Sequence, residues 1–136
     1  MKKTNNKGFS LVELIVVIAI MAVLIGVLAP TFTKYVEQSR RSTDIQNAEA
    51  IKTAMLADIA DGTKSGSNTN VTVDATNKPT SIAEAPTIQG SINKGANFTM
   101  DYDATAGTCK VYASGYELTN PTDAASYKTA TAAKTP

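Results

Sequence analysis

The sequence predicts an α+β fold in which one long, kinked N-terminal helix packs its second half on a small antiparallel β-sheet. Three observations lead to this fold class. A mainly apolar stretch from Phe9 to Ala29 is long enough for a helix of about 30 Å. Apolar residues then recur at three- and four-residue spacing between Ile45 and Ile59. Two alternating segments, 96–103 and 108–114, flank a turn and predict a β-hairpin.

The composition excludes most catalytic chemistry. The chain has 136 residues, a formal net charge of +1 and no histidine, which suits one small domain with an N-terminal membrane element. Cys109 is the only cysteine, so an intrachain disulfide and a histidine-activated thiol are both excluded. The lysines of the second half are isolated, so we expect no sequence-specific nucleic-acid partner. We therefore predict a structural subunit rather than an enzyme, with no cofactor and no bound metal.

Three interpretations of the apolar stretch compete. Lys2, Lys3 and Lys7 precede it, which predicts a cytoplasmic N-terminus and an extracytoplasmic remainder. A cleaved secretory signal fits poorly, because Pro30 follows Ala29 and a carboxylate interrupts the apolar core. A plain single-span anchor explains length and orientation. A charge at the centre of a membrane helix costs about 2.5–3.5 kcal/mol, but a carboxylate in the first turn costs less, so the anchor stays open.

The third interpretation places a cut between Gly8 and Phe9. Phe9 would then carry a new α-amino group, and Glu13 would lie four residues further on. The Phe9 amine of a neighbouring subunit could pair with Glu13, so that two charges that are costly in lipid offset each other only on association. In this interpretation Glu13 sets the register of assembly.

The segment from Lys7 to Glu13, KGFSLVE, closely resembles the cleavage motif of type IV pilins and related pseudopilins. The resemblance covers about the first 60 residues. It implies cleavage after Gly8 by a prepilin peptidase, which also methylates Phe9. It further implies a single-pass precursor in the cytoplasmic membrane that polymerises through its N-terminal helix into an extracellular type IV pilus filament. The filament would serve adhesion, motility or DNA uptake.

The resemblance also implies partners: other copies of the chain, the prepilin peptidase/methyltransferase, a membrane assembly platform and a motor ATPase. Two alternatives remain. One is a pseudopilin of a type II secretion or competence system, which makes a short fibre. The other is a single-span, membrane-anchored extracellular binding module, with the region 62–136 as the binder.

The second half of the long helix is expected over 30–61. Pro30 lacks an amide donor and crowds the carbonyl of Gly26, so this pair predicts a kink between two helical halves. The polar segment from Glu37 to Asp44 is expected to be solvated. The alternative is that it contacts adjacent subunits through Arg40, Arg41 and Asp44. The apolar stripe is expected to face the core. Its members are Ile45, Ala48, Ile51, Met55 and Ile59.

The remaining chain is divided by turn signals. Asp61 and Gly62 predict the end of the helix, and Gly62–Asn70 reads as a polar loop. Short strands are expected at Val71–Val73, Thr87–Gln89 and Tyr116–Leu118. In the hairpin, alternation predicts one apolar side on each strand: Phe98, Met100 and Tyr102 on the first, and Cys109, Val111 and Ala113 on the second.

The expected organisation has five parts. They are a leader (1–8), a membrane or filament-core helix (9–29), an amphipathic half (30–61), a β-rich head (62–120) and a loose Thr-, Ala- and Lys-rich tail (121–136). Asp101 to Thr105 places oxygen ligands as a calcium loop begins, but Ala106 replaces the glycine of such a loop, and Tyr112 replaces its glutamate. A hairpin turn with surface aspartates is the preferred interpretation.

Overall fold

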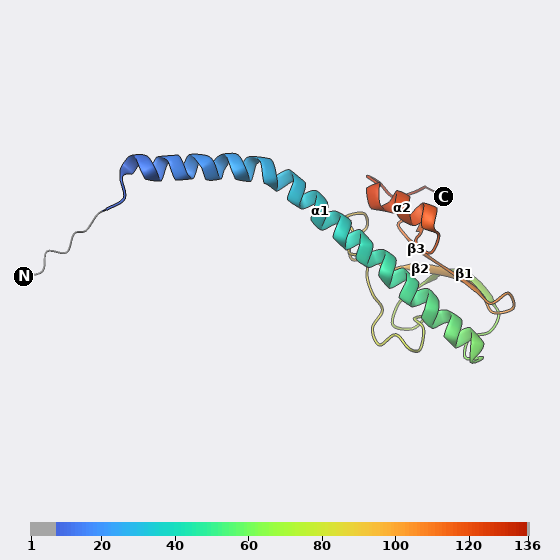
Figure 1. The fold of residues 1–136 in the computed structure, drawn as a ribbon. Helices are drawn as coiled ribbons and strands as arrows, with labels where there is room; N and C mark the ends of the chain where they lie inside the picture. Colours follow the sequence, from blue (N-terminus) through green and yellow to red (C-terminus); the bar gives the residue numbers. More distant parts are fainter. Residues whose placement is uncertain (1–7, 136) are drawn as a thin grey trace, which may run out of the picture. The chain divides into compact units, whose positions relative to one another are not determined.

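The computed structural model describes residues 8–135. Its elements are α1 (Leu11–Ala60), β1 (Ser67–Thr72), β2 (Thr99–Asp103), β3 (Thr108–Ala113), β4 (Tyr116–Glu117) and α2 (Pro121–Thr129) (Figure 1). The chain forms two compact units that divide between Tyr35 and Val36, and α1 contributes to both. A long N-terminal helix, a small antiparallel sheet and a short helix confirm the predicted α+β, pilin-like fold class.

Helix α1 continues without interruption through Gly26 and Pro30. The hydroxyls of Thr31 and Thr33 donate to the carbonyls of Leu28 and Pro30, at 2.8 and 3.0 Å. A proline and hydroxyl groups that bond back to the preceding turn both favour helix bending. The kink at Gly26 and Pro30 stays a prediction.

Helix α1 ends where the turn signal predicts. The amide of Gly62 donates to the carbonyl of Ile59 at 3.1 Å, and Gly62 has φ = 75°. Only glycine adopts this left-handed conformation without steric cost, which is why a glycine terminates the helix.

The sheet is antiparallel throughout, in the order β1-β2-β3-β4. Strands β2 and β3 form the predicted hairpin, in which Tyr102 lies opposite Cys109 and Thr99 opposite Tyr112. The alternation predicted the apolar side of each strand correctly. Phe98, Met100, Tyr102, Cys109, Val111 and Ala113 are all buried.

In the structure, the head is the whole second compact unit, from Val36 onward. Its core forms between this sheet face and the second half of α1. Ala48, Ile51 and Met55 are completely buried, while Ile45 and Ile59 are half-buried and pack against the same cluster. The predicted amphipathic stripe is therefore confirmed as core. At about 25 cal/mol per Å² of apolar surface, such burial is the dominant stabilising contribution to a domain of this kind.

Two strand predictions need correction. Strand β1 begins at Ser67, inside the segment expected to be a polar loop. The prediction failed because β1 is an edge strand, whose side chains are mostly exposed and show no alternation. Thr87 makes only an isolated bridge to Asn97, so Thr87–Gln89 is not a strand.

The prediction of a loose tail over 121–136 is wrong for Pro121–Thr129, which form α2. The side chain of Asn120 caps this helix by accepting the amide of Thr122 at 3.0 Å, and Pro121 occupies the first turn. Two side chains of α2, Ala124 and Tyr127, are buried. Asn-Pro followed by an acidic residue is a helix-start signal that the polar composition of the segment obscured.

Candidate processing and assembly site

The expected cleavage junction lies ahead of α1. Gly8 and Phe9 precede the helix, and Phe9 is 92% exposed. No atom of the described residues lies within 4 Å of a Cβ placed on Gly8. The backbone at this junction is therefore open to an approaching enzyme. Lys2, Lys3 and Lys7, the basic residues of the expected leader, lie outside the described residues.

Glu13 lies in the first turn of α1, where it caps the helix. Its Oε2 accepts the amide of Ser10 at 2.8 Å, and the carbonyl of Ser10 accepts the amide of Leu14 at 3.2 Å. Ser10 followed three residues later by Glu13 is the sequence signature of a capping box. The pairing of Glu13 with the Phe9 amine of a neighbouring subunit stays a prediction.

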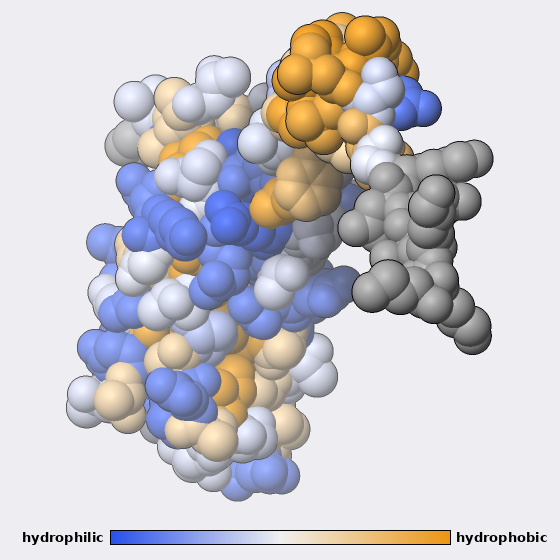
Figure 2. All heavy atoms as spheres, turned by 90° about the vertical axis from the view of Figure 1, so that its left-hand side faces the viewer, coloured by the Kyte–Doolittle hydropathy of each residue, from blue (hydrophilic) through white to orange (hydrophobic). Residues whose placement is uncertain are grey.

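The helix that follows Glu13 exposes its apolar side chains. The large hydrophobic residues between Phe9 and Leu28 are between 46% and 92% exposed. Within the described residues α1 alone is long and apolar enough to cross a membrane, and none of that stretch is buried. Figure 2 shows these side chains gathered into an apolar surface over the N-terminal part of α1. A surface of this kind requires lipid or another protein to cover it.

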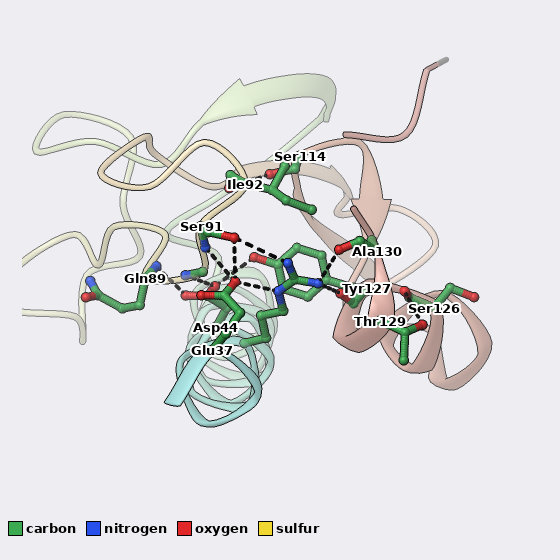
Figure 3. A network of polar contacts seen from close by, with 12 residues as sticks. Glu37, Asp44, Gln89, Ser91, Ile92, Ser114, Ser126, Tyr127, Thr129 and Ala130 are labelled. Carbon is green, nitrogen blue, oxygen red and sulfur yellow. Dashed lines mark hydrogen bonds and ion pairs between the residues drawn. The ribbon is translucent and has the colours of Figure 1, made fainter. Parts of the chain in front are cut away.

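The head contains a buried polar network that the sequence did not predict (Figure 3). Asp44 is completely buried, and its carboxylate accepts the amides of Gln89 and Gly90 at 2.7 and 2.8 Å. It also accepts the hydroxyl of Tyr127 at 2.8 Å. Burial, and then the hydrogen bond to Asp44, raise the pKa of Tyr127, so the phenol stays a neutral donor.

Arg41 joins the C-terminal segment to α1. Its Nη1 donates to the carbonyls of Tyr127 and Ala130, at 2.8 and 2.6 Å, and its Nε donates to Glu37 at 2.7 Å. Arg41 is only 5% exposed. The expectation that Arg41 and Asp44 face solvent or adjacent subunits is therefore wrong, whereas Arg40 is exposed. The signal was available, because positions 41 and 44 continue the spacing of the apolar stripe.

Three carboxylates on one face of α1 hold the long connection between β1 and β2. Besides Asp44, Glu37 accepts the amide of Ser91 at 2.7 Å, and Asp58 accepts the amide of Thr80 at 2.8 Å and its hydroxyl. Burial opposes ionisation of Glu37, but hydrogen bonds from Ser91 and Arg41 outweigh it and lower the pKa of Glu37. Among the described residues every buried side-chain polar atom has a partner.

The carboxylate of Asp103 in the hairpin turn accepts hydrogen bonds from backbone amides of the same turn. Asp103 Oδ1 accepts the amides of Thr105 and Ala106 at 2.8 and 3.1 Å, which is the bonding of a turn. Within residues 8–135 no cluster of three or more His, Cys, Asp or Glu residues could hold a metal ion. Burial raises the pKa of the Cys109 thiol to about 11, so this side chain stays protonated in the core.

Comparison with known proteins identifies a known motif in the N-terminal segment. Residues 3–29 match the family described as "Prokaryotic N-terminal methylation motif". The chain is 36% identical over 76 residues to "Prepilin peptidase-dependent protein A" of Clostridium perfringens (strain 13 / Type A), a match that covers 56% of the chain and 54% of the relative. It is 29% identical over 68 residues to "Type IV major fimbrial protein FimA" of Dichelobacter nodosus, covering 50% and 42%.

These matches span about half the length of the curated relatives or less. No solved structure gives a significant match. The matched motif contains the Gly8–Phe9 junction, Glu13 and the apolar stretch to Ala29. The comparisons therefore show that this chain carries the prokaryotic N-terminal methylation motif at its start and is similar, over about half its length, to a prepilin peptidase-dependent protein and a type IV fimbrial protein.

Proposed function

We propose that the chain is a prepilin, a structural subunit whose leader is removed after Gly8 and whose new N-terminus at Phe9 is methylated. The observation that carries this proposal is the order of features at the start of the chain. An accessible Gly8–Phe9 junction precedes Glu13, which lies in the first turn of a helix with exposed apolar side chains. The printed names of the relatives support it, since one is a prepilin peptidase-dependent protein and another a fimbrial protein.

In this proposal the subunit passes through two environments. Residues 9–29 first span the cytoplasmic membrane, with the N-terminus inside, and then pack against neighbouring copies in the filament core. Lipid solvates apolar side chains as well as a neighbouring helix does, so this transfer gains little from the hydrophobic effect. A membrane platform and a motor ATPase supply the work. The extracellular filament then serves adhesion, motility or DNA uptake.

Glu13 has two separable roles. As a hydrogen-bond acceptor it caps α1 through the amide of Ser10. As an anion it pairs with the Phe9 amine of a neighbouring subunit. A charge pair buried among apolar helices is favourable only when both partners are present. The pairing therefore fixes the register between subunits.

Filament assembly in cells that produce the pilus machinery tests this role. Glu13→Gln keeps a side-chain acceptor for the helix cap but removes the charge, so we expect long surface filaments to be lost while the membrane precursor accumulates normally. Glu49→Gln, at an exposed glutamate further along α1, is the matched control and should assemble.

Three outcomes of this experiment count against the proposal. Equal filament abundance in the Glu13→Gln strain contradicts the pairing role. Only short, envelope-confined fibres with the unmodified chain indicate a pseudopilus instead of a pilus. Surface binding activity without any polymer indicates a membrane-anchored binding module.

A further inference from the structure

A groove of about 460 Å³ opens on the face of the sheet that points away from the core. Its lining comes from three strands and the C-terminal tail, and includes Thr69, Asn70, Thr99, Asp101, Tyr112 and Lys134. Thr99, Asp101 and Tyr112 alternate with the buried residues of β2 and β3, so they lie on the opposite face of the sheet. The groove has the volume that small-molecule sites commonly have, and no part of the proposed assembly mechanism uses it.

A β-bulge shapes one wall of this groove. The register of β1 against β2 shifts between Asn68 and Val71, and Asn70 adopts a left-handed conformation with φ = 54°. The amide of Asn70 then donates to Oδ1 of Asp101 on β2 at 2.6 Å. Bulges and left-handed non-glycine residues carry a conformational cost and are frequent where a strand re-aims side chains toward a ligand. This bulge turns Asn70 toward the groove lining.

Tyr112 supplies a half-buried aromatic ring next to the same carboxylate. It lies opposite Thr99 on β2, two residues from Asp101 on the same face. Burial, and then the hydrogen bond to Asp101, raise the pKa of Tyr112 to about 12, so the phenol is neutral at ordinary pH. The ring offers an apolar surface, and the carboxylate beside it offers further hydrogen-bond acceptor sites.

The C-terminal tail closes the remaining wall. The amide of Lys134 donates to the carbonyl of Ser114 at 2.9 Å, and Gly115 has φ = 83°. A Cβ on Gly115 would lie 2.2 Å from the carbonyl oxygen of Lys134, so only glycine allows the tail to cross here. The ammonium group of Lys134 is paired with Asp123 at 2.8 Å. That pairing leaves the lining poorly suited to an anionic ligand.

We propose that this groove binds an uncharged, hydroxyl-rich ligand, namely an oligosaccharide that contains neutral hexoses. The ring of Tyr112 would stack on the apolar face of a sugar. The Asp101 carboxylate would accept hydrogen bonds from sugar hydroxyls. The side-chain amide of Asn70 and the hydroxyl of Thr99 would both donate hydrogen bonds to the sugar and accept them from it. This binding function is independent of polymerisation and goes beyond the proposed role as a filament subunit.

The experiment uses the full-length chain in detergent micelles and a printed array of oligosaccharides with neutral and sialylated members. Binding of the best neutral glycan is then titrated by calorimetry. We expect a dissociation constant that rises at least about tenfold, roughly 1.4 kcal/mol, in Asp101→Asn and in Tyr112→Leu. Thr108→Ala, at an exposed residue on the same face of β3 but outside the groove lining, is the matched control and should bind normally.

A thermal unfolding curve accompanies each variant. Where Tyr112→Leu or Asp101→Asn unfolds the head, Thr99→Val decides, because it keeps the shape of a lining side chain and loses only the hydroxyl assigned to the sugar. Weakened neutral-glycan binding by this variant supports the site. Absence of neutral-glycan binding by the unmodified chain overturns the proposal, as does binding that none of these variants weakens. Binding of sialylated glycans alone overturns the assigned ligand class.

Discussion

The hydroxyl of Tyr127 donates a 2.8 Å hydrogen bond to the buried carboxylate of Asp44, across 83 residues of sequence. This bond attaches α2 to the middle of α1, and Arg41 reinforces it through two carbonyls of the same segment. The chain has one cysteine and therefore no intrachain disulfide to tie down its C-terminal region. The polar network performs that task by hydrogen bonding.

Removal of the Tyr127 hydroxyl should destabilise the head. Tyr127→Phe keeps the ring in the core but takes one donor from a buried carboxylate, which costs about 1.5–3 kcal/mol for a bond to a charged group. Urea unfolding followed by circular dichroism measures the change. Tyr35→Phe is the control, because Tyr35 is 71% exposed and should shift stability by less than about 0.5 kcal/mol. Equal stability of Tyr127→Phe and the unmodified chain would show that the network contributes nothing.

Gly90 should tolerate no side chain. A Cβ at this position would lie 2.7 Å from the Tyr127 hydroxyl oxygen and 3.0 Å from Oδ2 of Asp44. We therefore expect Gly90→Ala to destabilise the head by about 1–3 kcal/mol through overpacking, measured as a lower midpoint of thermal unfolding. Gly26→Ala is the matched control, since a Cβ there meets nothing within 4 Å. A midpoint that does not fall in Gly90→Ala would contradict the described packing.

The contribution of Glu37 should depend on pH. Its pKa in the folded chain is lowered from the ordinary 4.5, so the stability it adds is present above pH 4.5 and disappears as the pH falls through the lowered value. The difference in unfolding free energy between the unmodified chain and Glu37→Gln should therefore be largest near neutral pH and shrink in acid. Denaturant titrations from neutral to acidic pH measure it, and a difference that grows toward acid would have the wrong sign.

Arg41 should control the opening of the C-terminal segment. Arg41→Met keeps much of the side-chain stem but removes the donors to the carbonyls of Tyr127 and Ala130. Hydrogen exchange should accelerate at amides of α2 while those of the β2–β3 hairpin stay protected. Arg40→Met, at the exposed neighbouring arginine, is the control. Uniform acceleration across the whole head would indicate global destabilisation instead.

The parts of the fold with strong periodicity could be predicted from the sequence. The stripe on α1 and the β2–β3 hairpin bury one face each, so apolar residues mark that face directly. The predicted strand at Val71–Val73 overlaps only the end of β1. The part of β1 from Ser67 onward escaped prediction because an edge strand with exposed side chains carries no such pattern. Helix α2 escaped because it is short and polar, and because one buried aromatic residue, Tyr127, anchors it.

The polar network illustrates a different limit. Charged residues are almost never buried unless paired, so Arg41 and Asp44 suggested a solvated face. The spacing of the apolar stripe marks both positions as facing inward, but it does not reveal their partners, which are mainly backbone groups of residues 89–90, 127 and 130. The N-terminal methylation motif needed no tertiary information, because residues 3–29 form one continuous segment.

The mass of the mature protein tests the central claim most directly. The chain should be isolated from cells that contain an active prepilin peptidase, and its intact mass and N-terminal peptide determined. We expect a protein that begins at Phe9 and carries one methyl group on the α-amine. An N-terminus that is still Met1 or Lys2 in such cells would contradict the proposed prepilin function.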